Sequence, residues 1–387
     1  MMDAQPLYDL SPLGVLMLKG LLIALLPLAW VWVRNRHATP ARRLQALTLL
    51  TLFLTFDLIL FGAFTRLTDS GLGCPDWPGC YGHSSPLGAQ AQITAAQTAM
   101  PTGPVTHGKA WIEMVHRYLA TGVGVLILAG LALSWQARRR AAEGGARVSL
   151  MWPLLTLVWV CVQGAFGALT VTMKLFPAIV TLHLLGGLVL LALLCTQAVR
   201  HAQAAGTSAV ALAPGARAWL VVALAALWLQ VALGGWVSTN YAVLACSEFP
   251  RCQGSWWPMM DFVQGFELWR PLGQTGTGEH IGFAALTAIH YAHRLAAYAV
   301  LALLGLAAWA VRKPLPVQAK WLAGLALLQL LTGLSNVVLG WPLVAAVLHT
   351  GGAAALVAVL TWALATSRRG VGAVTTSSDH GHPRVVA

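Results

Sequence analysis

The chain has 387 residues, of which 58% are hydrophobic and 9% carry a charged side chain. This composition and the mean hydropathy of +0.70 exclude a water-soluble globular protein, and they predict a polytopic membrane protein. The formal net charge of +12 is interpreted as a signal of membrane orientation and not of nucleic-acid binding.

Nine apolar runs are long enough to cross about 30 Å of hydrocarbon as helices. In chain order they cover residues 13–33, 45–66, 110–134, 150–172, 177–199, 217–238, 282–311, 318–340 and 343–366. No basic segment precedes the first run, so we expect a retained helix and not a cleaved signal peptide. The last residues, 370–387, have no apolar period and are predicted to form a disordered cytoplasmic tail.

The basic residues predict the orientation, because Lys and Arg near span ends accumulate on the cytoplasmic side. They gather after the first, third, fifth, seventh and ninth runs, around residues 34–43, 138–147, 200–217, 312–320 and 368–369. We therefore expect a multi-pass protein of a bacterial inner membrane, with a periplasmic N-terminus and a cytoplasmic C-terminus. Two long connections, residues 67–109 and 239–279, then lie on the outer side.

Each long outer connection contains two cysteines with the same spacing, Cys74 with Cys80 and Cys246 with Cys252. Disulfides persist on the oxidising side of a membrane, so both pairs are predicted to be bonded. The alternative is a zinc site made by the first pair with a loop histidine such as His83 or His107.

The chain also contains an internal repeat. Residues 61–65 and both members of the first cysteine pair recur 172 positions later. With an offset of 177, Glu113 and His116 map onto His290 and His293. With an offset of 166, four further residues recur: Gln163, Gly167, His183 and Gly186 map onto Gln329, Gly333, His349 and Gly352.

The repeat predicts an all-α integral membrane fold with two parallel four-helix bundles, residues 44–205 and residues 206–369. Residues 1–43 would form an additional N-terminal transmembrane helix and a basic loop outside this symmetry.

Four histidines lie within the predicted spans, His116 and His183 in the first bundle and His293 and His349 in the second. An ionisable side chain inside a membrane is costly and marks a functional site. Two histidines at one depth on different helices suit axial ligation of one heme iron, so each half is predicted to bind a heme. For any single histidine, a hydrogen bond to a neighbouring helix remains the alternative.

Three arginines, Arg66, Arg117 and Arg294, lie at the outer ends of their helices. Their guanidinium groups have two interpretations, since they either pair with heme propionates or extend toward the lipid headgroups.

The two copies differ at one informative position, because Glu113 of the first half is replaced by His290 in the second. Glu113 precedes His116 by three residues, so both side chains are expected on one helix face. A carboxyl group in an apolar pocket suits proton transfer, whereas a bond to a neighbouring helix is the alternative role. The difference predicts that the first half does chemistry and that the second holds a permanent redox cofactor.

Residues 62–72, the Cys74–Cys80 loop, the Glu113-x-x-His116-Arg117 motif and the three further histidines resemble the heme A synthase family. The similarity extends over about residues 44–367. It implies an enzyme that converts heme O to heme A, by oxidising the C8 methyl group to a formyl group in successive hydroxylations. The family usually has eight spans, so the first helix has no counterpart.

The same resemblance implies roles for the site residues. His116 and His183 would hold the substrate heme O, His293 and His349 would ligate a resident heme b, Glu113 would assist the oxidation, and Cys74 and Cys80 would form a disulfide. The implied partners are a heme O synthase, cytochrome oxidase assembly factors and an unidentified electron donor or acceptor. A homo-oligomer is compatible with this interpretation.

Two other functions compete with this one. A diheme b-type cytochrome that oxidises quinol would explain the histidines but leaves Glu113 without a role. A heme transporter would need a site open to both sides, whereas the candidate ligands all lie near the outer face.

Overall fold

The computed structural model describes residues 8–141 and 148–369, so the prediction of a disordered tail falls outside the described residues. In this part of the chain, nine helices are long and apolar enough to cross a membrane, which confirms the predicted all-α membrane fold. They are α1 (Leu13–Arg34), α2 (Pro40–Leu67), α4 (His107–Ala141), α5 (Met151–Thr172), α6 (Pro177–Ala204), α7 (Pro214–Thr239), α9 (Phe283–Val311), α10 (Pro316–Val338) and α11 (Leu343–Thr366).

Proline begins four of these helices, at positions where its missing N–H group is not needed for an intrahelical bond. They are α2, α6, α7 and α10, which start at Pro40, Pro177, Pro214 and Pro316. These four prolines therefore mark the first residues of four spanning helices in the sequence.

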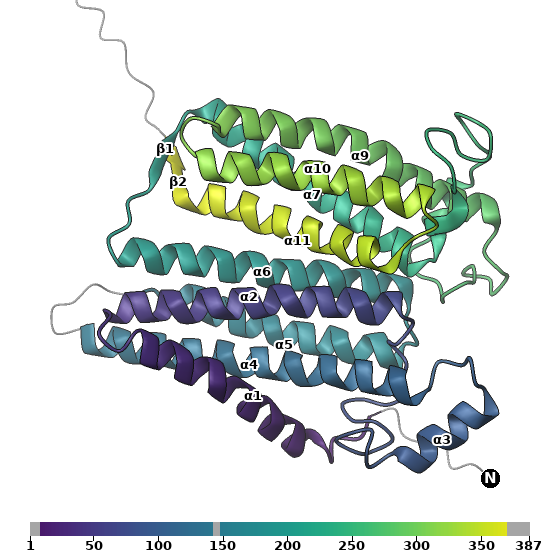
Figure 1. The fold of residues 1–387 in the computed structure, drawn as a ribbon, viewed down its shortest axis with the longest axis horizontal. Helices are drawn as coiled ribbons and strands as arrows, with labels where there is room; N and C mark the ends of the chain where they lie inside the picture. Colours follow the sequence, from purple (N-terminus) through teal and green to yellow (C-terminus); the bar gives the residue numbers. More distant parts are fainter. Residues whose placement is uncertain (1–7, 142–147, 370–387) are drawn as a thin grey trace, which may run out of the picture.

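Short elements lie outside the spans. The two long connections contain α3 (Gln90–Ala99), the 3-10 helix η1 (Ala242–Ala245) and α8 (Phe262–Gly265). At the other end of the molecule, β1 (Val210–Leu212) pairs in parallel with β2 (Ser367–Arg369), as Figure 1 shows. The sequence analysis did not predict this strand pair. We call the two ends of the molecule the loop end and the strand end.

The eight membrane-spanning helices after α1 form two rings of four, each closed by contacts between neighbouring helices. Helices α2, α4, α5 and α6 contact one another in the first ring, and α7, α9, α10 and α11 do so in the second (Figure 1). Between the rings, α6 packs against α11, α2 against α11 and α6 against α7. Because α2 corresponds to α7 and α6 to α11 in the repeat, these contacts indicate a pseudo-two-fold axis parallel to the helices.

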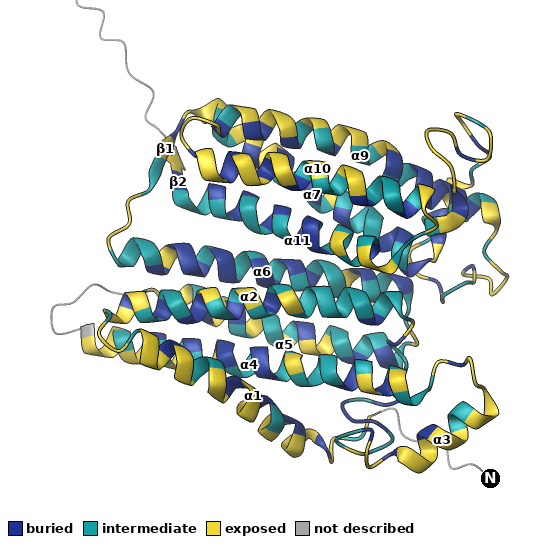
Figure 2. Ribbon diagram, viewed as in Figure 1, coloured by how far each residue is buried: buried dark blue, intermediate teal, exposed yellow. Residues whose placement is uncertain are grey.

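The rings meet through an apolar core. Leu188 and Leu191 of α6 and Leu356 and Leu360 of α11 are all at most 1% exposed. Figure 2 shows that α6 is mostly buried or intermediate, whereas α1 at the edge of the molecule has many exposed residues. An exposed apolar surface on such a helix is expected where lipid replaces water.

The additional helix α1 packs on α4 and reaches the first cysteine loop. A Cβ atom at Gly20 would lie only 2.5 Å from Thr121 Cγ2, so this glycine permits the close approach. Lys19 Nζ donates to the Ser84 carbonyl at 2.7 Å, and Asp9 N donates to the Trp77 carbonyl at 3.2 Å. Helix α1 therefore supports the loop that contains Cys74 and Cys80.

Candidate functional site

The second ring brings two of the predicted ligands together. His293 of α9 and His349 of α11 have ring centroids 6.4 Å apart, with an interplanar angle of 83°. An imidazole nitrogen binds a metal at about 2 Å and lies about 1 Å from its ring centre, so two rings on opposite sides of one metal have centroids about 6 Å apart. The spacing therefore fits one metal ion held between the two imidazoles.

A glycine on the adjacent helix faces each of the four histidines. A Cβ atom at Gly234 would lie 2.9 Å from His293 Cε1, and one at Gly333 would lie 3.2 Å from His349 Cε1. The corresponding distances in the first ring are 3.1 Å from Gly62 to His116 Nε2 and 3.5 Å from Gly167 to His183 Cε1. Each imidazole thus faces backbone without a side chain, in the same way in both halves.

The ligand count also suits a heme. Among the described residues, no group of three or more His, Cys, Asp or Glu side chains could hold a metal ion. A heme iron takes four nitrogens from the porphyrin and leaves two axial positions for the protein, so two histidines are sufficient. The chemistry and the spacing of the second-ring pair therefore fit a heme better than a metal ion held by protein side chains alone.

Both predicted disulfides are present. Cys74 bonds to Cys80 and Cys246 bonds to Cys252, each pair with Cα atoms 4.9 Å apart. The alternative of a zinc site at the first pair is therefore wrong, because bonded cysteines cannot ligate the metal as thiolates.

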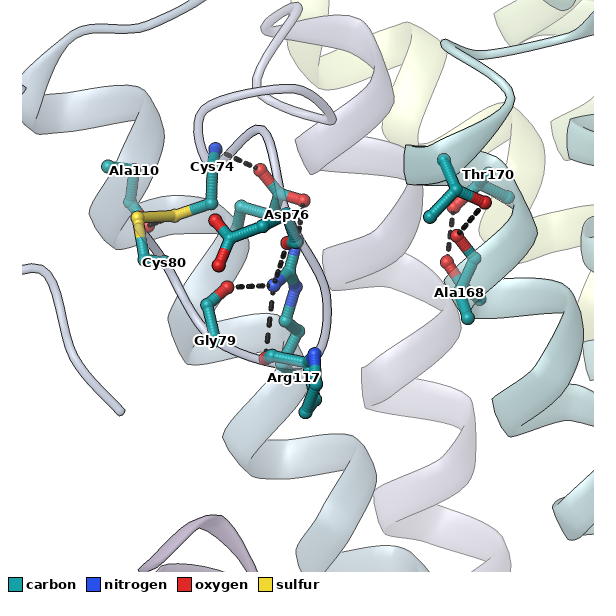
Figure 3. Close-up of polar contacts among 12 residues, drawn as sticks. Cys74, Asp76, Gly79, Cys80, Ala110, Arg117, Ala168 and Thr170 are labelled. Atoms are coloured by element: carbon teal, nitrogen blue, oxygen red, sulfur yellow. Dashed lines mark hydrogen bonds and ion pairs between the residues drawn. A yellow bond between two sulfur atoms is a disulfide. The ribbon is translucent and has the colours of Figure 1, made fainter. Parts of the chain in front are cut away.

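Arg117 lies against the first cysteine loop. Its Nη1 donates to the carbonyls of Asp76 at 3.0 Å, Pro78 at 3.1 Å and also Gly79, as Figure 3 shows for Gly79 beside the disulfide. The side chain is 11% exposed. These contacts bind the first cysteine loop to α4, and the expected pairing of Arg117 with a propionate or a headgroup stays a prediction.

Arg294 has the corresponding position in the second half. Its guanidinium group donates to the carbonyls of Cys246 at 3.4 Å, Glu248 at 3.1 Å and Arg251 at 2.9 Å. Arg294 is buried, and its expected pairing with a propionate likewise stays a prediction. The two arginines bind their cysteine loops to the helices that carry His116 and His293.

Arg66 joins the two halves at the loop end. Its Nη2 donates to the Ser238 carbonyl at 2.6 Å, its Nη1 pairs with Asp69 at 3.3 Å, and its guanidinium lies 4.0 Å from the centroid of Tyr241. Tyr241 donates to Asp69 at 2.5 Å, and partial burial raises the pKa of Tyr241, which keeps its hydroxyl protonated. Ser238 and Tyr241 are the repeat counterparts of Arg66 and Asp69, so the contact crosses the pseudo-two-fold axis.

Glu113 is buried, and both of its carboxylate oxygens have polar partners. One carboxylate oxygen accepts from Cys74 N at 2.8 Å, and the other pairs with Arg117. At the equivalent place in the second half, His290 Nδ1 lies 3.0 Å from the Ala242 carbonyl. Both side chains contact the backbone of their own loop, but only Glu113 brings a negative charge.

Two residues next to the second histidine pair were missed by the sequence analysis. Gln230 Nε2 lies 3.0 Å from His293 Nδ1, and Thr332 Oγ1 lies 2.9 Å from His349 Nδ1. The repeat offsets of 172 and 166 place Leu58 and Phe166 at the equivalent positions. A comparison of the two copies for polar differences near the histidines would have found both residues.

Comparison with known proteins agrees with this geometry. Residues 45–361 match the model of a family described as cytochrome oxidase assembly protein. The heme A synthase of Shewanella oneidensis is 40% identical over 319 residues, which cover 80% of this chain and 92% of that protein. The chain belongs to the heme A synthase family.

More distant relatives carry the same name. The heme A synthase of Caulobacter vibrioides is 29% identical over 336 residues, covering 80% of this chain and 91% of that protein. That of Halalkalibacterium halodurans is 26% identical over 301 residues, covering 75% and 86%. The family match contains all four candidate histidines and both cysteine pairs, whereas α1 precedes it.

Proposed function

We propose that this protein is a heme A synthase, which oxidises the C8 methyl group of heme O to a formyl group through two hydroxylations. The observation that carries the proposal is the His293–His349 pair, spaced for one metal and repeated as His116 and His183 in a chain of this family. Helices α4 and α6 would hold the substrate heme O, and α9 and α11 would hold a resident heme b.

The second ring supplies what a resident heme needs. A bound heme b would provide one-electron redox chemistry there. His293 and His349 would take its axial positions, and Gly234 and Gly333 leave the space beside the two rings free of side chains. The surrounding apolar helices exclude water, which limits loss of the group from the site.

In the first ring, the carboxylate of Glu113 is proposed to accept or return a proton during oxidation of the methyl group. Cys74 N and Arg117 hold its two oxygens in place, one turn of α4 from His116. Proton transfer therefore requires the carboxylate to break its contact with Cys74 N or with Arg117. The second half has His290 at this position, which supports a division between a reactive half and a redox half.

For the membrane orientation, we propose that the loop end is periplasmic in a bacterial inner membrane. The disulfides lie at the loop end, while the basic residues near the C-terminal ends of α1, α4, α6 and α9 lie toward the strand end. The N-terminus would then be periplasmic and the C-terminus cytoplasmic. A heme O synthase would hand over the substrate, and heme A would pass to cytochrome oxidase assembly.

The function is tested by pigment analysis of the purified protein. We expect heme b together with heme O or heme A in the extract, separated by reversed-phase chromatography, and conversion of added heme O to heme A in membranes that contain the protein. Two equivalents of heme b with no conversion would instead support the diheme cytochrome. Heme found at a site accessible from both faces would support a transporter.

The glycines give a second prediction. Gly234→Ala is expected to lower the heme b content several-fold, because the new Cβ would lie 2.9 Å from His293 Cε1 and must displace that ring. The matched control is Gly324→Ala in α10, where nothing lies within 4 Å of the added atom. Heme b per chain, measured by the pyridine hemochrome assay, checks both variants. Equal occupancy in the two variants would contradict the role of Gly234.

A further inference from the structure

The two histidine pairs differ in the side chains that lie beside their Nδ1 atoms. In the second ring, a polar side chain from the neighbouring helix contacts Nδ1 of each histidine, Gln230 for His293 and Thr332 for His349. In the first ring, the positions equivalent to these two residues are Leu58 and Phe166, which have no hydrogen-bonding side chain.

Thr332 selects one tautomer of His349. Its hydroxyl donates its single proton to the Leu328 carbonyl at 2.7 Å, so toward His349 Nδ1, at 2.9 Å, the oxygen acts as an acceptor. His349 Nδ1 therefore carries the proton, and Nε2 keeps the lone pair that binds a metal. A hydrogen bond from Nδ1–H also increases the basicity of Nε2 and fixes the orientation of the ring.

Gln230 restricts His293 in a different way. Its amide nitrogen lies 3.0 Å from Nδ1 and 3.1 Å from the carbonyl oxygen of the same residue. An amide nitrogen only donates, so in this contact Nδ1 is the acceptor and the ring proton lies on Nε2, the opposite of the tautomer that Thr332 favours at His349.

His183, the counterpart of His349, has no such support. Among the described residues, His183 Nδ1 is a buried atom without a hydrogen-bond partner, whereas His116 has a backbone hydrogen-bond partner at Leu58. The imidazole of His116 also lies parallel to the ring of Phe61, with centroids 6.1 Å apart. At His183, neither the tautomer nor the ring orientation is selected by a neighbouring side chain.

We propose that Thr332 is a positioning residue that makes the second ring a site of permanent heme binding, whereas the first ring, in which His183 has no such partner, binds heme exchangeably. This inference rests on the proposed function, because it explains how one fold retains a cofactor in one half and releases a product from the other. Rigid ligands slow dissociation, and ligands that rotate freely allow heme to enter and leave.

The test compares Thr332→Val with Thr332→Ser in the purified holoprotein. Valine keeps the size of threonine but removes the hydroxyl, and serine keeps the hydroxyl but removes the methyl group. We expect Thr332→Val to lose heme b to excess apomyoglobin about tenfold faster or more, the usual effect of removing an outer hydrogen bond to a metal ligand. The reduction potential should also rise, because a less basic imidazole stabilises ferric iron less well. Thr332→Ser should resemble the wild type.

The matched control is Thr55→Val. Thr55 is a buried threonine of α2 whose hydroxyl donates to Thr51 O at 2.7 Å, so the substitution removes a similar bond away from either histidine pair. Heme loss and potential should stay at the wild-type values. A wild-type rate and potential in Thr332→Val, or the same losses in Thr332→Ser, would overturn the inference. Absence of heme b from the wild type would instead overturn the proposed function.

Discussion

Substitution of His349 by alanine is expected to remove the resident heme b from the purified protein, whereas His116→Ala leaves it bound. His349 and His293 form the pair whose 6.4 Å separation fits a single metal, so loss of either imidazole leaves the iron with one protein ligand. His116 belongs to the other ring and does not contact this pair. Heme b per chain, measured by pyridine hemochrome, should fall about tenfold or more in His349→Ala and His293→Ala.

A control separates this effect from the general cost of removing a buried imidazole. His201 of α6 is 3% exposed and lies 3.4 Å from Gln197, near the strand end and away from the four ligand candidates. His201→Ala should therefore retain full heme b. Full heme b in both second-ring variants, together with its loss in His116→Ala, would reverse the assignment of the two halves.

Glu113→His is expected to abolish heme A formation while the first cysteine loop stays folded. The second half already has histidine at this position, where His290 contacts the loop carbonyl of Ala242 and lies 3.5 Å from Arg294. The variant thus copies an arrangement that the fold accepts, but it removes the carboxylate. Loss of a group that transfers protons lowers the rate by about 100-fold or more. Conversion of heme O in membranes, followed by chromatography, measures this loss.

Glu113→Ala and His290→Glu complete the experiment. Alanine leaves Arg117 without its carboxylate, and breaking a buried ion pair in this way costs about 3–5 kcal/mol, so we expect a less stable loop with faster cleavage by protease. His290→Glu should keep heme A formation, because it alters the redox half only. Heme A formation at the wild-type rate in Glu113→His would remove the carboxylate from the mechanism and leave it the role of holding the loop.

The sequence was sufficient to predict the nine spans, the repeat and the disulfides. The predicted run of residues 282–311 agrees with α9 at Phe283–Val311, and the first run of 13–33 agrees with α1 at Leu13–Arg34. The bilayer explains this success, because a spanning segment must satisfy its own backbone hydrogen bonds and therefore shows its length and helical form in composition alone. The equal cysteine spacing and the recurring histidines needed only comparison of the chain with itself.

Only the tertiary structure decided which partners the polar side chains at the loop end have. Arg117 contacts carbonyls about 40 residues earlier in the chain, Arg66 crosses to the other half, and Lys19 shows that the additional helix supports a loop. The sequence alone does not show these contacts, because each of them joins residues that are far apart along the chain.

The physical reason is the range over which each property acts. Apolar periodicity and charge bias depend on neighbours within a few residues, so the chain by itself determined its helices, its duplication and the four candidate heme ligands. A hydrogen bond such as that between Thr332 and His349 depends on how two helices pack side by side and on the rotation of each about its axis. Packing and helix rotation are set by contacts along the whole length of both helices, so only the tertiary structure decided that Thr332 lies beside His349.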